Sequence, residues 1–276
     1  MLKLKSFAKI NIGLEVLYKR KDGYHEINTI FSKISLADDI IIEPNKELVV
    51  ECIPSIGIHQ EQNLAYKSSK LIQKYFDCKS KTAKITIFKN IPLGGGLGGG
   101  SSNAASVLAG LNEYWQLNAS NEALIKIAKE IGADVPFFFG SKFAIGQGTG
   151  DKLRYFDFHF PYHLLLVAPG VKIDTAWAYS QLRRTENQKS GSNLKEILIN
   201  NIKHPKQLQL LVKNDFEEIA FTKYPELLEI KKSLHNNGAV FALMSGSGST
   251  IYGFFDDYNL LKKANEFFKN SRTFEC

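Results

Sequence analysis

Cysteine is scarce in this 276-residue chain: Cys52, Cys78 and Cys276 are scattered, odd in number and without a Cys-x-x-Cys pair. Such a set supports neither a disulfide framework nor a zinc site, so no dedicated metal ligands are expected. No apolar stretch approaches the roughly 18 residues of a membrane helix. Met1–Ser6 enters a strand pattern directly, without the apolar core of a signal peptide. These absences predict a cytoplasmic protein that has no membrane partner.

Long basic runs are also absent, although the net charge is +7. Lys19–Lys21 and Arg183–Arg184 are the densest basic clusters, and both are short for a nucleic-acid surface. Positive charge serves equally well a cleft that gathers small polyphosphates. We therefore expect small-molecule substrates and no nucleic acid. The sequence leaves the oligomeric state open.

The chain has the composition of an ordinary globular protein, with 44% hydrophobic and 23% charged residues. Its length suits two modest domains that share a cleft. Strand and helix patterns segregate rather than alternate, which favours an α+β fold. The predicted strands are 2–17, 27–36, 39–43, 47–52, 83–88, 142–145, 163–168, 239–244 and 249–255. The predicted helices are 63–76, 101–116, 121–131, 175–182, 193–200, 206–212, 225–236 and 258–269.

The most informative segment is a glycine-rich run between a predicted strand and a predicted helix. Its six glycines carry no Cβ that would hold a phosphate away from the backbone, and the positive N-terminus of the next helix faces the same space. A flexible linker is the alternative, but both flanks are strongly patterned, which favours an anion site. The predicted site consists of Pro92, Leu93, Gly94, Gly95, Gly96, Leu97, Gly98, Gly99, Gly100, Ser101 and Ser102.

Three common phosphate-binding motifs fit this run poorly. Gly94–Gly99 satisfies G-x-G-x-x-G, but no second strand ending in an acidic residue follows about 20 positions on. Ser101 and Ser102 stand where a Walker-A loop needs Lys followed by Ser or Thr. The chain also lacks the His-Arg-Asp and Asp-Phe-Gly segments of protein kinases. A phosphate loop in this run would therefore be of another kind.

In outline the run resembles the phosphate loop of the GHMP kinases, Pro-x-x-x-Gly-Leu-Gly-Ser-Ser, with extra glycines. Four further segments of the chain add to this resemblance: Phe7-Ala-Lys-Ile-Asn-Ile-Gly13, Asp22-Gly-Tyr-His25, Gly132-Ala-Asp-Val-Pro136 and Met244-Ser-Gly-Ser-Gly-Ser249. The Asp-Gly-Tyr-His segment is typical of the members that phosphorylate 4-diphosphocytidyl-2-C-methyl-D-erythritol on the non-mevalonate route to isoprenoid precursors.

The resemblance implies a fold, a co-substrate and a division of the chain. Residues 1–155 would form an ATP-binding half like ribosomal protein S5, and residues 156–276 a ferredoxin-like half that completes the substrate cleft. ATP would be the co-substrate, with Mg²⁺ held partly by Ser101 or Ser102. The candidates for the adenine pocket are Asn63, Leu64 and Lys89. A GHMP kinase for homoserine, mevalonate or a sugar, and an S5-like RNA-binding module without catalysis, remain alternatives.

Lys9 and Asn11 fall on one face of the first predicted strand, while Ala8, Ile10 and Ile12 point to the core. On pattern alone, a polar strand face is usually solvated. The resemblance instead implies that Lys9 is catalytic and that Asn11 contacts substrate. The compact charge of a lysine suits the stabilisation of phosphoryl oxygens.

Asp134 precedes a helix start that contains proline, where an aspartate commonly acts as an N-cap. The resemblance implies a different role. Asp134 would be the base that accepts the proton of the attacking hydroxyl, paired across the cleft with Lys9.

Tyr24 and His25 follow an Asp-Gly turn signal. The resemblance implies that this pair reads the cytidine half of the substrate, with His25 hydrogen-bonded to the base and Tyr24 lining the pocket. We predict Tyr179 as the stacking partner of cytosine in preference to Trp177, because helical residues two apart do not share a face. Asp174, just before this helix, stands where a small neutral residue is more usual.

Overall fold

The computed structural model describes residues 1–182 and 190–276, so that Arg183–Arg184 lies outside the described residues. The chain forms two compact units, each assembled from several segments. Unit 1 comprises Met1–Ala8, Lys33–Ile91 and Gly98–Ser141, and unit 2 comprises Lys9–Ser32, Pro92–Leu97 and Lys142–Cys276. The division predicted after residue 155 separates sequence domains rather than packing units and stays a prediction. None of the described helices has the length and apolar character needed to cross a membrane.

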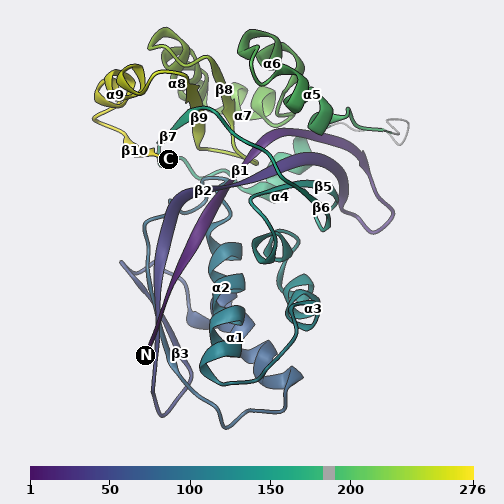
Figure 1. Cartoon of the computed structure of the whole chain (residues 1–276), viewed down its shortest axis with the longest axis vertical. Helices are drawn as coiled ribbons and strands as arrows, with labels where there is room; N and C mark the ends of the chain where they lie inside the picture. The colour runs from purple at the N-terminus through teal and green to yellow at the C-terminus, as the bar shows by residue number, and fades with distance from the viewer. Residues whose placement is uncertain (183–189) are drawn as a thin grey trace. The chain divides into compact units, whose positions relative to one another are not determined.

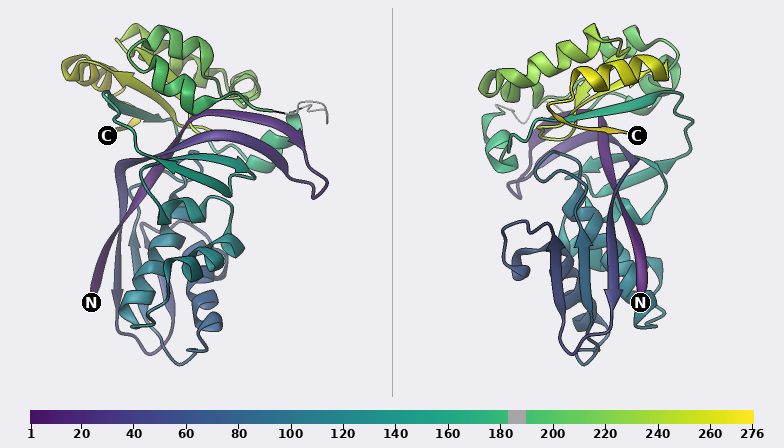
Figure 2. Two further views of the ribbon diagram at one scale, coloured as in Figure 1. Left: turned by 45° about the vertical axis from the view of Figure 1, so that its right-hand side comes forward. Right: turned by 90° about the vertical axis from the view of Figure 1, so that its left-hand side faces the viewer.

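Two long strands, β1 (Leu2–Lys19) and β2 (His25–Glu43), are paired with each other and contribute residues to both units. In unit 1, β2 also pairs antiparallel with β4 (Lys84–Phe88), and β4 pairs parallel with β3 (Val49–Ile53). The helices of unit 1 are η1 (Gln60–Gln62), α1 (Leu64–Tyr75), α2 (Gly99–Tyr114), α3 (Asn121–Ile131) and η2 (Val135–Phe139). Figures 1 and 2 show α1, α2 and α3 on one side of this sheet.

The core of unit 1 lies between the sheet and these helices. Alternate strand residues and the apolar face of α2 meet there, and complete burial of each such side chain stabilises the fold by about 1.5–3 kcal/mol. Its fully buried members include Ile40, Ile42, Ile85, Ile87, Val107, Leu108 and Leu111. This packing fixes the position of α2, the helix that follows the glycine-rich run.

Unit 2 contains the remaining elements of the described chain. Its strands, besides parts of β1 and β2, are β5 (Phe143–Gly148), β6 (Lys152–Phe156), β7 (His163–Ala168), β8 (Phe241–Met244), β9 (Ile251–Phe255) and β10 (Arg272–Glu275). Its helices are α4 (Thr175–Gln181), α5 (Leu194–Asn201), α6 (Pro205–Leu211), α7 (Glu217–Lys223), α8 (Pro225–Asn236) and α9 (Tyr258–Phe267). The first half of β2 pairs antiparallel with β5, and β5 pairs antiparallel with β6.

Strands from the second half of the chain form a four-stranded antiparallel sheet in the order β10-β7-β9-β8. Its chain order, strand, helices, two strands, helix, strand, is that of a ferredoxin-like domain, as predicted. Residues of α7, α8 and α9 share a buried apolar cluster with residues of β7, β8 and β9. The helices can be followed in Figure 1.

Several elements differ from the sequence prediction. The two strands predicted at 27–36 and 39–43 are one strand, β2, and α2 begins at Gly99 rather than at residue 101. Gly146–Gly148, predicted as part of a turn, belongs to β5. β6, α7 and β10 were missed because they are short and largely exposed, so they show no apolar period, and pairing or packing against neighbours fixes them instead.

Candidate active site

The glycine-rich run ends at the first turn of α2, and no side chain caps this turn. The N-cap is Gly98, with a left-handed φ of 68° and no side-chain hydrogen bond to the helix. The amides of Gly99, Gly100 and Ser101 therefore keep their hydrogen-bonding capacity for a ligand. A serine cap, the alternative to a phosphate-binding role for Ser101 and Ser102, is not what the structure shows.

The first part of the same run, in unit 2, packs against the turn between β8 and β9. Ser245 Oγ donates to the carbonyl of Gly96 over 2.9 Å, and the Thr250 amide donates to the carbonyl of Gly95 over 3.2 Å. A Cβ on Gly96 would lie 1.9 Å from the Ser245 carbonyl oxygen. Glycine is therefore required at residue 96 to let two backbones approach, whatever its role toward a phosphate.

Lys9 and Asn11 are buried in unit 2, at 4% and 2% exposure, so the strand face that carries them is not solvated. Lys9 Nζ donates to Asn11 Oδ1 over 2.7 Å and lies 5.4 Å from the centre of the Phe31 ring. Asn11 Nδ2 donates to Thr29 Oγ1 over 2.9 Å, which fixes the amide orientation. Asn11 thus orients the ammonium of Lys9, and its contact with substrate stays a prediction.

Asp134, in unit 1, sits at the N-cap position of η2 but makes no capping hydrogen bond with its side chain. Its φ and ψ of −80° and −17° are helical, unlike the extended backbone of a typical N-cap. The capping role that the sequence offered as an alternative is therefore not the one observed. The side chain is half-buried.

The Asp-Gly-Tyr-His segment forms the turn between β1 and β2, and the contacts within it explain the residue types. Asp22 Oδ1 accepts from the Tyr24 amide over 3.1 Å, and Gly23 has a φ of 87°. Arg20 pairs with Asp22 at 2.9 Å and with Glu26 at 3.0 Å. The Arg20 guanidinium lowers the pKa of the exposed Asp22 carboxyl below its usual range. This network presents Tyr24 with 67% of its surface exposed.

His25 and Tyr179 come together in unit 2, and their roles toward cytosine stay predictions. Their rings are stacked, with centroids 4.9 Å apart and planes 20° apart. Trp177 faces elsewhere, under Lys223 Nζ at 3.7 Å from its ring centre. Asp174 caps α4 by accepting from the Trp177 amide over 2.6 Å, so this unusual residue supports the helix that carries Tyr179.

The two serines after the loop differ in their fitness for Mg²⁺. Ser102 is 1% exposed and its hydroxyl bonds to Ser6 over 2.7 Å, which leaves little room for an ion. Ser101 is half-buried, and its hydroxyl makes no hydrogen bond to another described residue. No three His, Cys, Asp or Glu side chains of the described chain gather as a metal cage. Ser101 fits an ion held mainly by phosphate oxygens and water.

The adenine-pocket candidates have structural partners of their own. Asn63 Oδ1 accepts from the Ala65 amide over 2.9 Å and so caps α1, and Lys89 forms a buried ion pair with Asp38. Sequence reasoning missed Asp38 altogether, although an acidic residue inside an apolar strand is a signal for a buried partner. The pocket roles of Asn63, Leu64 and Lys89 stay predictions.

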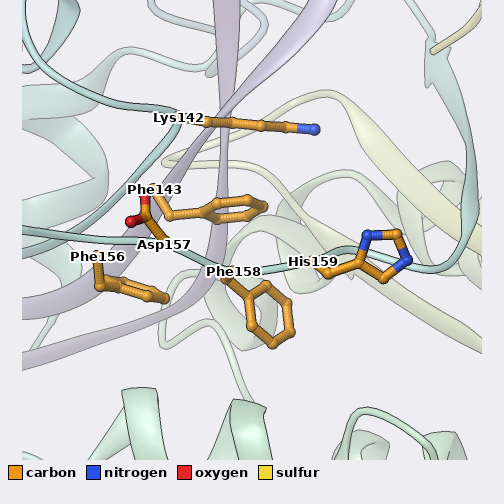
Figure 3. Close-up of a pocket in the computed structure, with 6 residues that line it drawn as sticks. All are labelled: Lys142, Phe143, Phe156, Asp157, Phe158 and His159. Carbon is orange, nitrogen blue, oxygen red and sulfur yellow. The ribbon is translucent and has the colours of Figure 1, made fainter.

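A cavity of about 420 Å³ in unit 2 contains none of the predicted site residues. Figure 3 shows its lining at the ends of β5 and β6 and in the segment after β6. The residues are Lys142, Phe143, Phe156, Asp157, Phe158 and His159. Phenyl rings dominate the cavity, and it offers no arrangement for phosphoryl transfer.

Known proteins resemble this chain along its whole length. Residues 63–142 match the GHMP kinases N terminal domain family, and residues 194–270 the GHMP kinases C terminal family. The 4-diphosphocytidyl-2-C-methyl-D-erythritol kinase of Thermodesulfovibrio yellowstonii is 40% identical over 98% of this chain and 95% of its own. A crystal structure of 4-(cytidine 5'-diphospho)-2C-methyl-D-erythritol kinase matches with a TM-score of 0.84 and 31% identity, over 99% of this chain and 98% of that one. Mevalonate kinase of Methanococcus jannaschii shares the fold, with a TM-score of 0.73 and 16% identity over 100% and 97% of the two chains.

The chain belongs to the GHMP kinase family, whose members use ATP as co-substrate. Within that family, the full-length relatives place it among the 4-diphosphocytidyl-2-C-methyl-D-erythritol kinases. The two-domain GHMP architecture predicted from the sequence is confirmed.

Proposed function

We propose that this kinase transfers the γ-phosphate of ATP to the 2-hydroxyl of 4-diphosphocytidyl-2-C-methyl-D-erythritol, a step on the methylerythritol phosphate route to isoprenoid precursors. The observation that carries the choice of substrate is the hydrogen-bonded Asp-Gly-Tyr-His turn, with His25 stacked on Tyr179. An aromatic surface beside a ring with hydrogen-bonding nitrogens suits a nucleobase. The 40% identical relative carries the same activity in its name.

The glycine-rich run supports the ATP side of the proposal. Phosphoryl transfer needs little covalent chemistry from the protein, so the rate comes from positioning and from stabilising the charge on the transferred group. The uncapped first turn of α2 offers backbone amides and a positive helix end for that charge. The residues proposed to hold the nucleotide phosphates are Pro92 to Ser102.

Lys9 and Asp134 are proposed as the catalytic pair. Asp134 would accept the proton of the attacking 2-hydroxyl, because its carboxylate is not used in capping η2. Lys9, buried and oriented by Asn11, would stabilise negative charge on the attacking oxygen and on the transferred phosphoryl group.

Mg²⁺ would accompany ATP and neutralise charge that develops on its phosphates. Ser101 is the residue proposed to help hold it. For the setting of the reaction, we propose the cytoplasm. The support is that the chain has only three cysteines, scattered and odd in number, which is typical of proteins from a reducing compartment.

The proposal is tested by measuring ADP release against a panel of GHMP kinase substrates. We expect turnover with 4-diphosphocytidyl-2-C-methyl-D-erythritol, and a phosphate monoester on its 2-hydroxyl by ³¹P NMR and mass spectrometry. Faster turnover of mevalonate, homoserine or a sugar would overturn the substrate assignment. Binding of RNA with no ATP consumption on any substrate would overturn the enzymatic reading.

A further inference from the structure

A buried carboxylate outside the predicted site contacts the chain on both sides of the phosphate loop. Asp38, on β2, has a side chain with 0% exposure, and its ion-pair partner Lys89 has 6%. A charge buried so deeply is tolerated only when it is paired and hydrogen-bonded, so each of its contacts has structural consequences. All of its partners belong to unit 1.

The first contacts hold the chain just before the loop. Asp38 Oδ1 accepts from the Asn90 amide over 2.7 Å and from the Ile91 amide over 2.8 Å. β4 ends at Phe88, so these two amides lie beyond the strand. By accepting from both, the carboxylate fixes the backbone that leads into Pro92.

The other oxygen holds the helix just after the loop. Asp38 Oδ2 accepts from Asn103 Nδ2 over 2.9 Å, and Lys89 Nζ donates to Asn103 Oδ1 over 2.9 Å. Asn103 lies in the second turn of α2, is 4% exposed and also donates to Ser6 Oγ over 2.9 Å. Lys89 Nζ lies 3.6 Å from the position of a Cβ on Gly99. The ion pair is therefore packed directly against the first turn of α2.

We infer that Asp38 is a positioning residue for ATP: it clamps both ends of the phosphate loop in its binding conformation. Between the clamped ends, Gly94, Gly96 and Gly98 have left-handed φ values of 66°, 75° and 68°. Glycines lose more conformational entropy on ordering than other residues, so an unclamped loop would lose that entropy when ATP binds. Ordering it during folding instead raises affinity. The inference rests on the proposed function, because it takes this loop as the ATP site.

Paired substitutions separate loop positioning from fold stability. Asp38→Asn alone would leave Lys89 buried without its counter-ion, a strongly destabilising change. Asp38→Leu with Lys89→Met removes both charges and the acceptor for the two amides. Asp38→Asn with Lys89→Gln also removes both charges but keeps an oxygen at the same position. Uncharged replacements of a buried ion pair are often close to neutral for stability, which keeps both double variants measurable.

Both double variants lose the Lys89 ammonium, so any contact of Lys89 with adenine is lost equally in both, and the difference between them reports the acceptor at residue 38. We expect the KM for ATP to be about tenfold or more higher in the Leu/Met variant than in the Asn/Gln variant. The KM for the cytidylyl substrate should change little in either. Asp39→Ala, which removes a neighbouring exposed ion pair with Lys5 at 2.6 Å, is the charge control and should leave both constants unchanged. The inference would be overturned if the two double variants had the same KM for ATP, or if the KM values for both substrates rose equally.

A single substitution tests the helix side of the clamp if the Leu/Met variant does not fold. Asn103→Ala keeps the ion pair but removes its link to α2, and we expect the KM for ATP to rise about threefold or more. The matched control is Asn112→Ala on the same helix, where the amide bonds Ala119 at 2.9 and 3.2 Å, remote from the loop. Equal effects of the two variants on ATP would show a loss of helix stability and overturn the clamp.

The same variants distinguish failure of the clamp from failure of the proposed function. Wild-type protein without turnover on the cytidylyl substrate would count against the proposed function alone. Calorimetric ATP affinities of the double variants would still decide the role of Asp38. Wild-type turnover together with unchanged ATP affinity in the Leu/Met variant would count against the clamp alone.

Discussion

A lysine on a strand is normally solvated, and Lys9 departs from that rule because its neighbours are also buried. At 4% exposure its ammonium is held by Asn11, whose amide is in turn oriented by Thr29. A buried ammonium interacts more strongly with nearby negative charge than a solvated one does, which suits the role proposed for Lys9. At the scale of the residue, the chemistry therefore depends on side chains that orient other side chains.

Asp134→Asn should abolish most activity without unfolding the protein. Because the carboxylate does not cap η2, the amide should be tolerated, and we expect kcat to fall roughly a hundredfold or more with both substrates still binding. Lys9→Met should have a comparable effect. If the two residues act as a unit, the double variant loses much less than the product of the single losses. A sharp drop in melting temperature with retained kcat would instead make Asp134 structural.

His25→Phe tests base reading while it preserves the ring stacked on Tyr179. Loss of the hydrogen bond to cytosine should weaken binding of the cytidylyl substrate by about 1–3 kcal/mol, with ATP binding unaltered. His235→Phe is the control, since its imidazole is hydrogen-bonded to the Ala239 carbonyl at 3.0 Å and His235 is not one of the predicted site residues. Calorimetry with each ligand separates the outcomes: equal loss for both ligands in His25→Phe would refute a cytidine-specific role.

Of the secondary-structure elements, α2 is the one on which ATP binding should depend most, through its N-terminal turn. Gly100 is exposed, and a Cβ there would meet only Leu64 Cδ1, at 3.7 Å, so Gly100→Val should fold. The new side chain would crowd the phosphate site and lower ATP affinity by about tenfold or more. Ala109→Val puts the same side chain on an exposed position of the same helix and controls for helix propensity. Unchanged ATP affinity in Gly100→Val would remove the phosphate-loop assignment.

Gly99 is the less useful position for this test. A Cβ there would lie 2.9 Å from Ile91 Cγ2, so a substitution would disturb the protein itself as well as the ligand site. The six glycines of the run thus serve different purposes. Gly96 allows close backbone packing, Gly98 adopts a left-handed backbone conformation, and Gly100 leaves room beside the first turn of α2.

The element η2 is held at its end by Lys33, which donates to the carbonyls of Phe138 at 3.0 Å and Gly140 at 2.6 Å. Burial lowers the pKa of the Lys33 ammonium from its ordinary 10.5. Between the lowered pKa and 10.5 the unfolded chain binds more protons than the folded one, so this residue makes the fold more stable as pH rises. The destabilisation caused by Lys33→Met should therefore grow between about pH 7 and pH 10.

Denaturant midpoints at the two pH values measure this growth as the difference between variant and wild type. Lys70→Met, at an exposed lysine of α1, is the control for the loss of a surface charge. If Lys33→Met destabilises the protein equally at both pH values, the pKa of the Lys33 ammonium is not lowered by folding. The same variant should also lower kcat, because Asp134 precedes the element that Lys33 holds.

For the whole molecule, ATP should raise the thermal stability. A ligand that binds only the folded state at a hundred times its Kd stabilises it by about 2.7 kcal/mol, which corresponds to a shift of roughly 5–10 °C for a chain of this size. Asp134→Asn should keep this shift, whereas Gly100→Val should lose most of it. A scan by calorimetry with and without ATP checks both, and loss of the shift in Asp134→Asn would place that residue in ATP binding.

The fold class and most long elements could be predicted from the sequence, because apolar periods are local and strong in segments such as α3 and β7. The segments Lys9–Ser32 and Pro92–Leu97, by contrast, belong to the packing unit of the C-terminal half of the chain. Their membership depends on contacts between residues far apart, such as Ser245 with Gly96, and no local pattern reports such contacts. Short elements such as β10 were missed for the same reason.

The sequence by itself indicated the kinase family, which the comparisons confirm, and it predicted the phosphate loop and the residues proposed for catalysis, since these predictions depend on residue type and spacing along the chain. Only the tertiary structure decided what each of these residues is used for. Burial and partners made Lys9 an oriented charge, denied Asp134 a capping role and brought His25 against Tyr179. Only the fold brought Asp38 to Ile91 and Asn103, because a hydrogen bond depends on distances that the chain acquires when distant segments pack.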